Sequence, residues 1–294
     1  MNVVHPTDIK NMPGVPKEAD AIVDQHSRKF RIFHICTQMA ELMPFMSVVN
    51  IKDRSVRDLF RVDGGIELLP FPDPGVTHHS EYYRMVNGNP DLLTGFAASI
   101  EAHRYIKAWL DPIRKEKKVL CITLRQYHVD TQRNSNIDEW RAFLDRVDKE
   151  EFSIVVVPDT DHIAKFKASP LGGYPCLEPA CFDVDLRTAL YESSYLNMSV
   201  NTGPAVSATL NKKVSYILFK ILVPDVPHCS AEFLQWNGYE IGATPRYATP
   251  FQKWVWEDDN VEILWREFCE MREKLEGTSR KRAVPDRVAQ GRSW

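Results

Sequence analysis

FSIVVVPDTD, residues 152–161, is the stretch that decides the fold class. Its apolar residues follow one another almost without interruption up to Val157, a run typical of a parallel strand that helices cover on both faces. A strand with one face in water would alternate apolar and polar residues instead. We therefore expect residues 152–161 to form a strand inside the sheet of an α/β protein.

The segments around this strand alternate between helix and strand patterns. Apolar residues recur at helical spacing across 136–150, where Asn136 and Glu139 stand at the positions of a capping box. Alternating strands and helices, joined by right-handed crossovers, give a doubly wound parallel sheet. The other predicted elements here are strands at 119–125, 195–203 and 214–222 and helices at 183–194 and 204–212.

Two longer helices are predicted at the ends of this region. Residues 92–118 form the first, and an amphipathic helix that begins near Val261 forms the second. The expected apolar positions of the first helix are Phe96, Ile100, Tyr105 and Trp109.

Length and charge limit the classes of function. The chain of 294 residues suits two lobes of ordinary size. Its 40 acidic and 37 basic residues leave a formal net charge of -3, so no overall cationic field attracts nucleic acid. No apolar run is long enough to cross a membrane or to serve as a signal peptide. We expect a cytoplasmic protein with no nucleic-acid partner and no transmembrane segment, and peripheral contact with the inner membrane face stays open.

The carboxyl ends of the predicted strands are rich in residues that can hold a ligand. Doubly wound sheets bind their ligands beyond this edge, so we expect these residues to converge on one site. They are Arg125 and Gln126, then Asp159 and Asp161, and finally Asn201, Thr202 and Gly203.

SVNTGPAVSA, residues 199–208, is the most specific of these strand ends. A Thr-Gly-Pro turn that opens a helix presents backbone N–H groups and the positive end of a helix dipole, which together stabilise an anion. Asn201 and Ser207 add polar groups, and Pro204 suits the first helical turn. The alternative is an ordinary turn that needs Gly203 for its backbone angles.

Arg125 is the second indication of an anion site. A charged residue at the end of a buried strand points into a cleft or water, and a planar guanidinium matches a diphosphate. Arg133 and Asn134 belong to the loop that follows. Either arginine could instead be a structural ion-pair partner.

The remaining candidates each have a structural alternative. Asp159 could bind a ribose or cap the helix after it, and Glu192 could accept hydroxyls of a sugar or lie exposed at a helix end. His78, close to Asp73, is the best candidate for a general base, although an incidental surface histidine is the alternative. Cys176 and Cys181 have no matching cysteine or histidine pair, so zinc is not expected.

These motifs resemble those of nucleotide-sugar glycosyltransferases with two Rossmann-like lobes, the GT-B type. The resemblance is carried by LR(x)7RNSN at 124–136, W(x)2F at 140–143, VVVPDTD, LYESSYLNMSVNTGP and QKWVWEDD. It is similar to bacterial enzymes of polysaccharide assembly, with a heptosyltransferase-like loop at Thr202–Pro204 and a fucosyltransferase-like arginine at Arg125. It covers about 119–270, because the usual first strand and Gly-rich loop are not found before that.

The resemblance implies an N-terminal acceptor lobe at 1–115, shortened or irregular, a C-terminal donor lobe at 116–275 and a basic tail at 276–294. It also implies transfer of a sugar from a nucleotide diphosphate to a hydroxyl of a glycan or lipid-linked acceptor, with no cofactor and no obligatory metal ion. The alternatives are a nucleotide-sugar epimerase or hydrolase on the same fold, and a non-catalytic glycan-binding protein.

The resemblance further implies a role for each candidate residue. Arg125 would stabilise the departing diphosphate, and Asp73 or His78 would deprotonate the acceptor if the reaction inverts. The residues expected to bind the donor are Arg133, Asn134, Asp159, Glu192, Asn201, Thr202, Gly203, Pro204 and Ser207.

Overall fold

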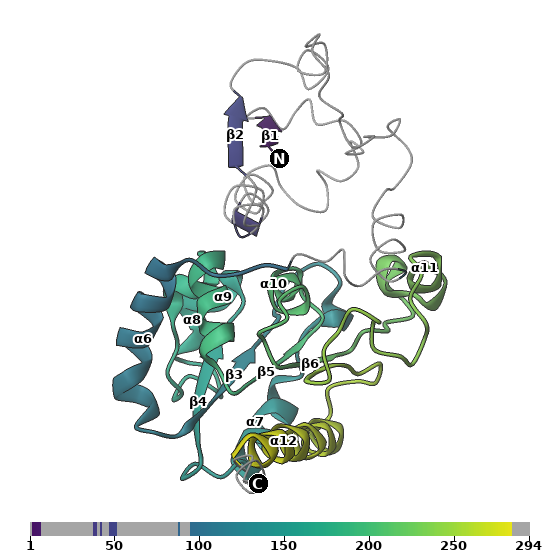
Figure 1. Cartoon of the computed structure of the whole chain (residues 1–294). Coiled ribbons are helices and arrows are strands. Elements are labelled where there is room, and N and C mark those ends of the chain that lie inside the picture. Colours follow the sequence, from purple (N-terminus) through teal and green to yellow (C-terminus); the bar gives the residue numbers. More distant parts are fainter. Residues whose placement is uncertain are drawn as a thin grey trace, which may run out of the picture.

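The computed structural model describes residues 2–6, 38–39, 42, 47–51, 88 and 95–283. Two short strands, β1 (Asn2–Pro6) and β2 (Ser47–Ile51), pair in parallel. Residues 95–283 form an α/β unit whose sheet is sandwiched between helices (Figure 1).

The main sheet has five strands in the order β4-β3-β5-β6-β7, and every pairing is parallel. Numbered along the chain this order is 2-1-3-4-5, which is the flavodoxin-like form of the doubly wound sheet. The predicted α/β fold class and the parallel doubly wound sheet are therefore confirmed. The strands are β3 (Lys118–Thr123), β4 (Phe152–Val157), β5 (Leu196–Val200), β6 (Tyr216–Phe219) and β7 (Gln252–Trp254).

Helices cover both faces of the sheet (Figure 1). On one face, α6 (Ile100–Arg114) and α9 (Val184–Ser193) share a core with the residues of β3 and β4 that point to their side. On the other face, α7 (Ile137–Arg146) and α12 (Val261–Ala283) pack against the alternate residues of the same strands. Burial of both faces explains why β4 is apolar except at Ser153.

Short helical segments make up the remaining connections. The α-helical ones are α8 (Ile163–Phe166), α10 (Val206–Thr209) and α11 (Ala231–Trp236). The 3-10 segments are η4 (Thr131–Arg133), η5 (Thr160–His162), η6 (Glu178–Cys181), η7 (Gly203–Ala205) and η8 (Pro227–Cys229).

The predicted first helix is shorter than expected. It begins at residue 100 because the Ser99 hydroxyl accepts the N–H of Ala102 at 3.0 Å and fixes the N-terminus there. Two of its four predicted apolar positions are wrong, since Ile100 and Tyr105 are 73% and 48% exposed. The other two, Phe96 and Trp109, pack against the core as predicted. The buried positions of the helix are Ala102, Ile106 and Leu110.

The predicted capping box of α7 is also wrong. The Asn136 side chain makes no capping hydrogen bond. The Glu139 carboxylate instead accepts the N–H of Val261 at 2.7 Å, so it caps the neighbouring helix α12. The edge strand β7 was not expected, because its three residues are too few for a periodic pattern.

The predicted lobe boundary at 115/116 falls between α6 and β3. Helix α6 nevertheless buries its apolar face against the same core as α9 and the sheet. Most of the expected N-terminal lobe lies outside the described residues, so its architecture and the boundary stay predictions. In the part of the chain that the structure describes, no helix has the length and hydropathy needed to span a bilayer.

Candidate functional site

The direction of the strand order reverses between β3 and β5. These two strands are paired, with Thr123 opposite Ser199, so the loops that leave their carboxyl ends lie next to each other. Ligands of doubly wound sheets bind at this switch point. The loop at 124–136 and the loop at 201–204, both singled out in the sequence, are the two loops that meet there.

The Arg125 side chain forms hydrogen bonds within its own loop, at 124–136. Its guanidinium donates to the carbonyls of Val129 at 2.9 Å and Asp130 at 3.1 Å and to the side-chain oxygen of Asn134. The arginine is only 6% exposed, and burial followed by the nearby charge of Arg133 lowers its pKa. These partners favour a structural role for Arg125, and its contact with a donor diphosphate stays a prediction.

Asn134 also holds the loop together. Its side-chain oxygen accepts the N–H of Tyr127 at 3.0 Å, and its amide nitrogen donates to the Tyr127 carbonyl at 2.9 Å. Because both ends of the amide are occupied, a role in binding a ligand stays a prediction that would require these bonds to be exchanged.

Arg133 connects the two loops. One guanidinium nitrogen donates to the Asn201 carbonyl at 3.1 Å, and another lies 2.8 Å from Nε2 of His228. The buried Nε of Arg133 has no hydrogen-bond partner among the described residues. Since a guanidinium can only donate, Nε2 of His228 is the acceptor. Burial and the charge of Arg133 lower the pKa of His228, which keeps its imidazole neutral for this role.

The second loop offers one buried hydroxyl group that no described residue uses. Thr202 is 8% exposed, and its buried hydroxyl has no partner there. Gly203 does not have a positive φ, and a Cβ added to it would meet nothing within 4 Å. The alternative of a turn that needs glycine for its backbone angles is therefore wrong. Neither backbone angle nor packing requires glycine here, so the open space next to Gly203 is available to a ligand.

The residues that flank Gly203 support the turn. Ser207 is fully buried, and its hydroxyl donates to the Pro204 carbonyl at 3.1 Å. The Asn201 N–H donates to the Phe219 carbonyl at 3.0 Å, which fixes the start of the loop. Donor contacts of these three residues stay predictions.

Asp159 links the end of β4 to the first loop. Its carboxylate caps η5 through the Asp161 N–H at 3.3 Å and accepts the Gln126 N–H at 3.1 Å. The capping alternative is therefore confirmed, and contact with a ribose stays a prediction.

Glu192 has a different setting from the one expected. It precedes β5 and so lies at the amino end of the strand, away from the 201–204 loop. Its carboxylate accepts from the Ala98 N–H at 2.9 Å and from the Asn211 amide at 2.8 Å and lies 3.0 Å from His103. The exposed alternative is wrong, because the side chain is 4% exposed. These contacts connect the segment that precedes α6 to the last turn of α9.

Asp73 and His78, the predicted catalytic pair, lie outside the described residues. Their role as general base stays a prediction.

Lys220 is a site residue that the sequence did not reveal. It follows β6 with a φ of 55°, and its ammonium group donates to the Asn134 carbonyl at 2.9 Å. It also pairs with Asp258 and Asp259, each at 2.8 Å. Burial opposes its charge, but the hydrogen bonds to the two carboxylates outweigh burial and raise its pKa. The sequence contains a signal that could have identified it: Lys220 interrupts an apolar strand pattern, and the pair Asp258 and Asp259 follows later in the chain.

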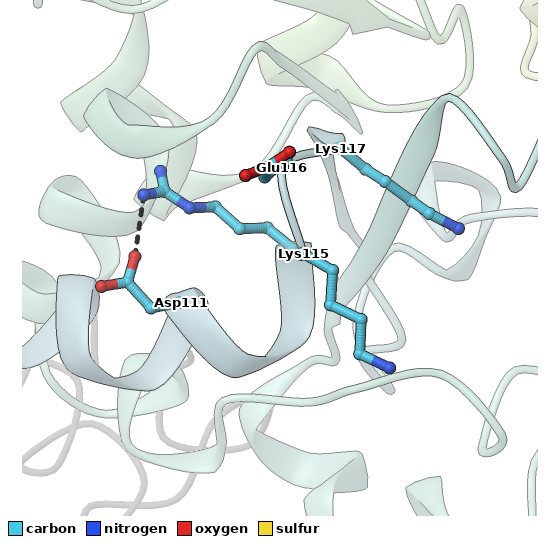
Figure 2. Close-up of a pocket in the computed structure, with 5 residues that line it drawn as sticks. Asp111, Lys115, Glu116 and Lys117 are labelled. Atoms are coloured by element: carbon cyan, nitrogen blue, oxygen red, sulfur yellow. Dashed lines mark ion pairs between the residues drawn. The ribbon is translucent and has the colours of Figure 1, made fainter.

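A hollow of about 310 Å³ lies at the opposite edge of the sheet (Figure 2). It is lined by Asp111, Arg114, Lys115, Glu116 and Lys117, where α6 ends and leads into β3. The ion pair between Asp111 and Arg114, at 2.8 Å, crosses part of it. This hollow is at the amino end of β3 and so is separate from the switch point.

The sheet order and the loops at its switch point define a doubly wound α/β protein with a candidate anion site. No protein-family model matches the chain, and no curated protein matches it.

The solved structures that are similar to this chain include the following two. One is the glycosyl transferase family 9 protein from Veillonella parvula DSM 2008, with 9% identity, a TM-score of 0.39, and coverage of 65% of this chain and 47% of that one. The other is the E. coli ADP-heptose LPS heptosyltransferase II, with 10% identity, a TM-score of 0.43, and coverage of 63% and 54%. This chain spans about half the length of each. The first is named as a glycosyl transferase and the second as a heptosyltransferase.

Proposed function

We propose that this chain is a glycosyltransferase that binds the diphosphate of a nucleotide-sugar donor at the switch point between β3 and β5. The sugar passes to a hydroxyl of a glycan or lipid-linked acceptor, in polysaccharide or glycan assembly and without a metal cofactor. The observation that carries the proposal is the hydrogen bond between Arg133 and the 201–204 loop. At this contact Nε of Arg133 and the hydroxyl of Thr202 are buried without a partner among the described residues, and the space next to Gly203 is open.

The unpaired donors match phosphate chemistry. A buried donor without a partner costs about 1–3 kcal/mol, so such groups in a folded protein call for an explanation. Nε of Arg133 and the hydroxyl of Thr202 are two such groups. Phosphate oxygens would accept from both, and the permanent charge of the guanidinium would balance the charge of the diphosphate.

The same groups suit the chemistry of transfer. As the glycosidic bond to the donor breaks, negative charge grows on the departing diphosphate. Donors that are already oriented toward this charge lower the barrier more than groups that must first reorganise. His228 keeps the Arg133 guanidinium oriented, because its neutral Nε2 accepts one guanidinium N–H at 2.8 Å. We assign acceptor deprotonation to Asp73 or His78, as the sequence suggested.

A thermal-shift screen tests the proposal. The full chain is heated with nucleoside diphosphates and with UDP-, GDP- and ADP-linked sugars. A ligand at 100 times its Kd stabilises a protein by about 2.7 kcal/mol, which corresponds to a rise in Tm of roughly 5–10 °C. The proposal fails if none of these ligands changes the Tm.

Arg133→Gln is the matched variant for this screen. It removes the charge but leaves the loop that Arg125 holds, so it should abolish the ligand-induced shift while the Tm without ligand changes little. Arg141→Gln is the control, because Arg141 is exposed on α7 and pairs with Asp138 at 3.7 Å. Product analysis by mass spectrometry with an added glycan acceptor then separates transfer from epimerisation and hydrolysis. Binding of a glycan without any nucleotide would indicate a non-catalytic protein.

A further inference from the structure

His228 lies between a cation and an anion of the 124–136 loop. Its Nε2 is 2.8 Å from a guanidinium nitrogen of Arg133 and 3.5 Å from a carboxylate oxygen of Asp130. A ring nitrogen accepts a hydrogen bond when it carries no proton and donates one when it does. Nε2 of His228 therefore binds only one of these two partners in each protonation state.

The neutral ring binds Arg133. A guanidinium can only donate, so its bond to His228 requires Nε2 without a proton, and the single ring proton is then on Nδ1. The hydrogen bond thereby selects one of the two neutral tautomers of His228.

The protonated ring matches Asp130 instead. Both ring nitrogens then donate, so Nε2 no longer accepts from Arg133, and two positive charges face each other at close range. The Asp130 carboxylate is already within ion-pair distance of Nε2, so the exchange of partners requires little movement of the ring.

The other ionisable groups around His228 leave this exchange to the two partners of Nε2. Arg125 belongs to the same loop and also lowers the pKa of His228, but its guanidinium is bound to carbonyls of its own loop. Along the segment that carries His228, Asp225 and Glu232 are exposed to solvent and Cys229 is buried. His228 is itself exposed, so it exchanges its proton with solvent without opening of the loop.

The backbone of the loop is held independently of His228. The Asp130 carbonyl accepts from the Arg125 guanidinium at 3.1 Å and from the Arg133 N–H at 2.9 Å. Protonation of His228 therefore acts on the side chain of Arg133 and leaves the loop in place.

We propose that His228 is a positioning residue that presents the Arg133 guanidinium when its ring is neutral and exchanges it for Asp130 when its ring is protonated. The effect on binding rests on the proposed function, because Arg133 is the charged group assigned there to the donor diphosphate. Only the neutral form then binds the donor well, so the apparent affinity follows the neutral fraction of His228. Burial and the charge of Arg133 lower the pKa of His228, so the neutral form predominates at neutral pH.

Nuclear magnetic resonance of the full chain with isotope-labelled histidine tests the exchange without any ligand. The signals of His228 are assigned by their absence in His228→Gln. At about pH 8 we expect the proton of the neutral ring on Nδ1, whereas an unconstrained histidine carries it mainly on Nε2. The proposal is overturned if the neutral ring of His228 carries its proton on Nε2.

Two substitutions separate the partners of His228. Asp130→Asn removes the carboxylate that receives the protonated ring, so it should shift the titration of His228 to lower pH. Asparagine tolerates the left-handed backbone of residue 130, where φ is 50°. Arg133→Gln removes the competing cation and should shift the titration to higher pH, whereas Arg141→Gln, on the surface of α7, should leave it unchanged. An unchanged titration in Asp130→Asn or in Arg133→Gln would contradict the exchange.

The effect on binding is measured with UDP-, GDP- and ADP-linked sugars from about pH 8 to about pH 5, because their phosphate diesters keep a constant charge in this range. The apparent Kd should rise about tenfold for each pH unit below the titration of His228. His228→Gln should bind with nearly the same Kd throughout, since the glutamine side-chain oxygen accepts from Arg133 at every pH.

The outcomes separate this proposal from the proposed function. An affinity of the unmodified chain that stays constant or rises as His228 is protonated overturns the role of His228. If no nucleotide sugar binds at any pH, the proposed function fails, and the spectra of His228 still decide whether the exchange occurs.

Discussion

Asp259→Asn should be far more damaging than Asp258→Asn, although the two substitutions are chemically identical. Both aspartates contact the ammonium group of Lys220 at 2.8 Å. The Asp259 side chain is fully buried, whereas that of Asp258 is 71% exposed. The two variants therefore compare a buried and an exposed ion pair of the same lysine.

The magnitude follows from the partners of Asp259. One carboxylate oxygen accepts the Asn136 N–H at 2.8 Å and the Trp140 indole N–H at 2.7 Å, and the other faces Lys220. An asparagine must turn its NH2 group toward one of these donors, so a buried donor loses its acceptor and Lys220 loses a counter-charge. Removing one of the two charges of a buried ion pair costs about 3–5 kcal/mol, and we expect Asp259→Asn to lower the free energy of unfolding by that amount. The exposed pair of Asp258 contributes about 0–1 kcal/mol.

Urea denaturation of both variants and of the unmodified chain measures the difference. Burial and the neighbouring Asp258 raise the pKa of Asp259, so the comparison is made at mildly alkaline pH, where the carboxylate is ionised. Equal losses for the two variants, or a loss below about 1 kcal/mol for Asp259→Asn, would refute the reasoning that the buried carboxylate holds the 124–136 loop.

Three other predictions concern single positions. Gly203→Leu should change the free energy of unfolding by less than about 0.5 kcal/mol, because Gly203 is exposed and an added Cβ meets nothing within 4 Å, yet it should abolish the ligand-induced Tm shift; a retained shift would place the ligand elsewhere. Gly172→Ala should cost about 1–3 kcal/mol in urea denaturation, because its Cβ would stand 2.5 Å from the Phe166 carbonyl oxygen and closer still to that of Lys167; an unchanged midpoint would contradict this packing. His228 has a lowered pKa in the folded chain, so the unfolded chain binds its proton first, and stability should fall as the pH drops below about 6.5 and level off once the folded pKa is passed. His228→Gln should flatten that part of the stability profile, and an identical profile would exclude His228 as its source.

The fold could be predicted because its signals are local. The nearly continuous apolar run at 152–157 requires cover on both faces, and the structure provides it from α6 and α9 on one side and α7 and α12 on the other. The boundaries were less predictable. Helix α6 begins where Ser99 caps it, and its apolar face is set by packing against α9 and not by the residues Ile100 and Tyr105 that a helical repeat selected.

The site was only partly predictable, because a side chain's role depends on which partners the fold brings near. The sequence favoured Arg125, at the end of a strand, over Arg133, in the loop that follows, as the residue that stabilises the diphosphate. In the structure, the first is surrounded by carbonyls of its own loop, whereas the second reaches Asn201 across the switch point. Glu192 looked like a ligand or an exposed residue, and it proves to be a buried acceptor for distant donors.

The sequence by itself determined the alternation of strands and helices and the places where polar loops interrupt it, because hydrophobic periodicity and turn chemistry are properties of neighbouring residues. Only the tertiary structure decided that β3 pairs with β5, and that Lys220 and Asp259 hold the loop carrying Arg133. Hydrogen bonds and ion pairs act over a few ångströms, so which residues form them is settled only when the packing of the sheet brings residues that are far apart in the chain within that range.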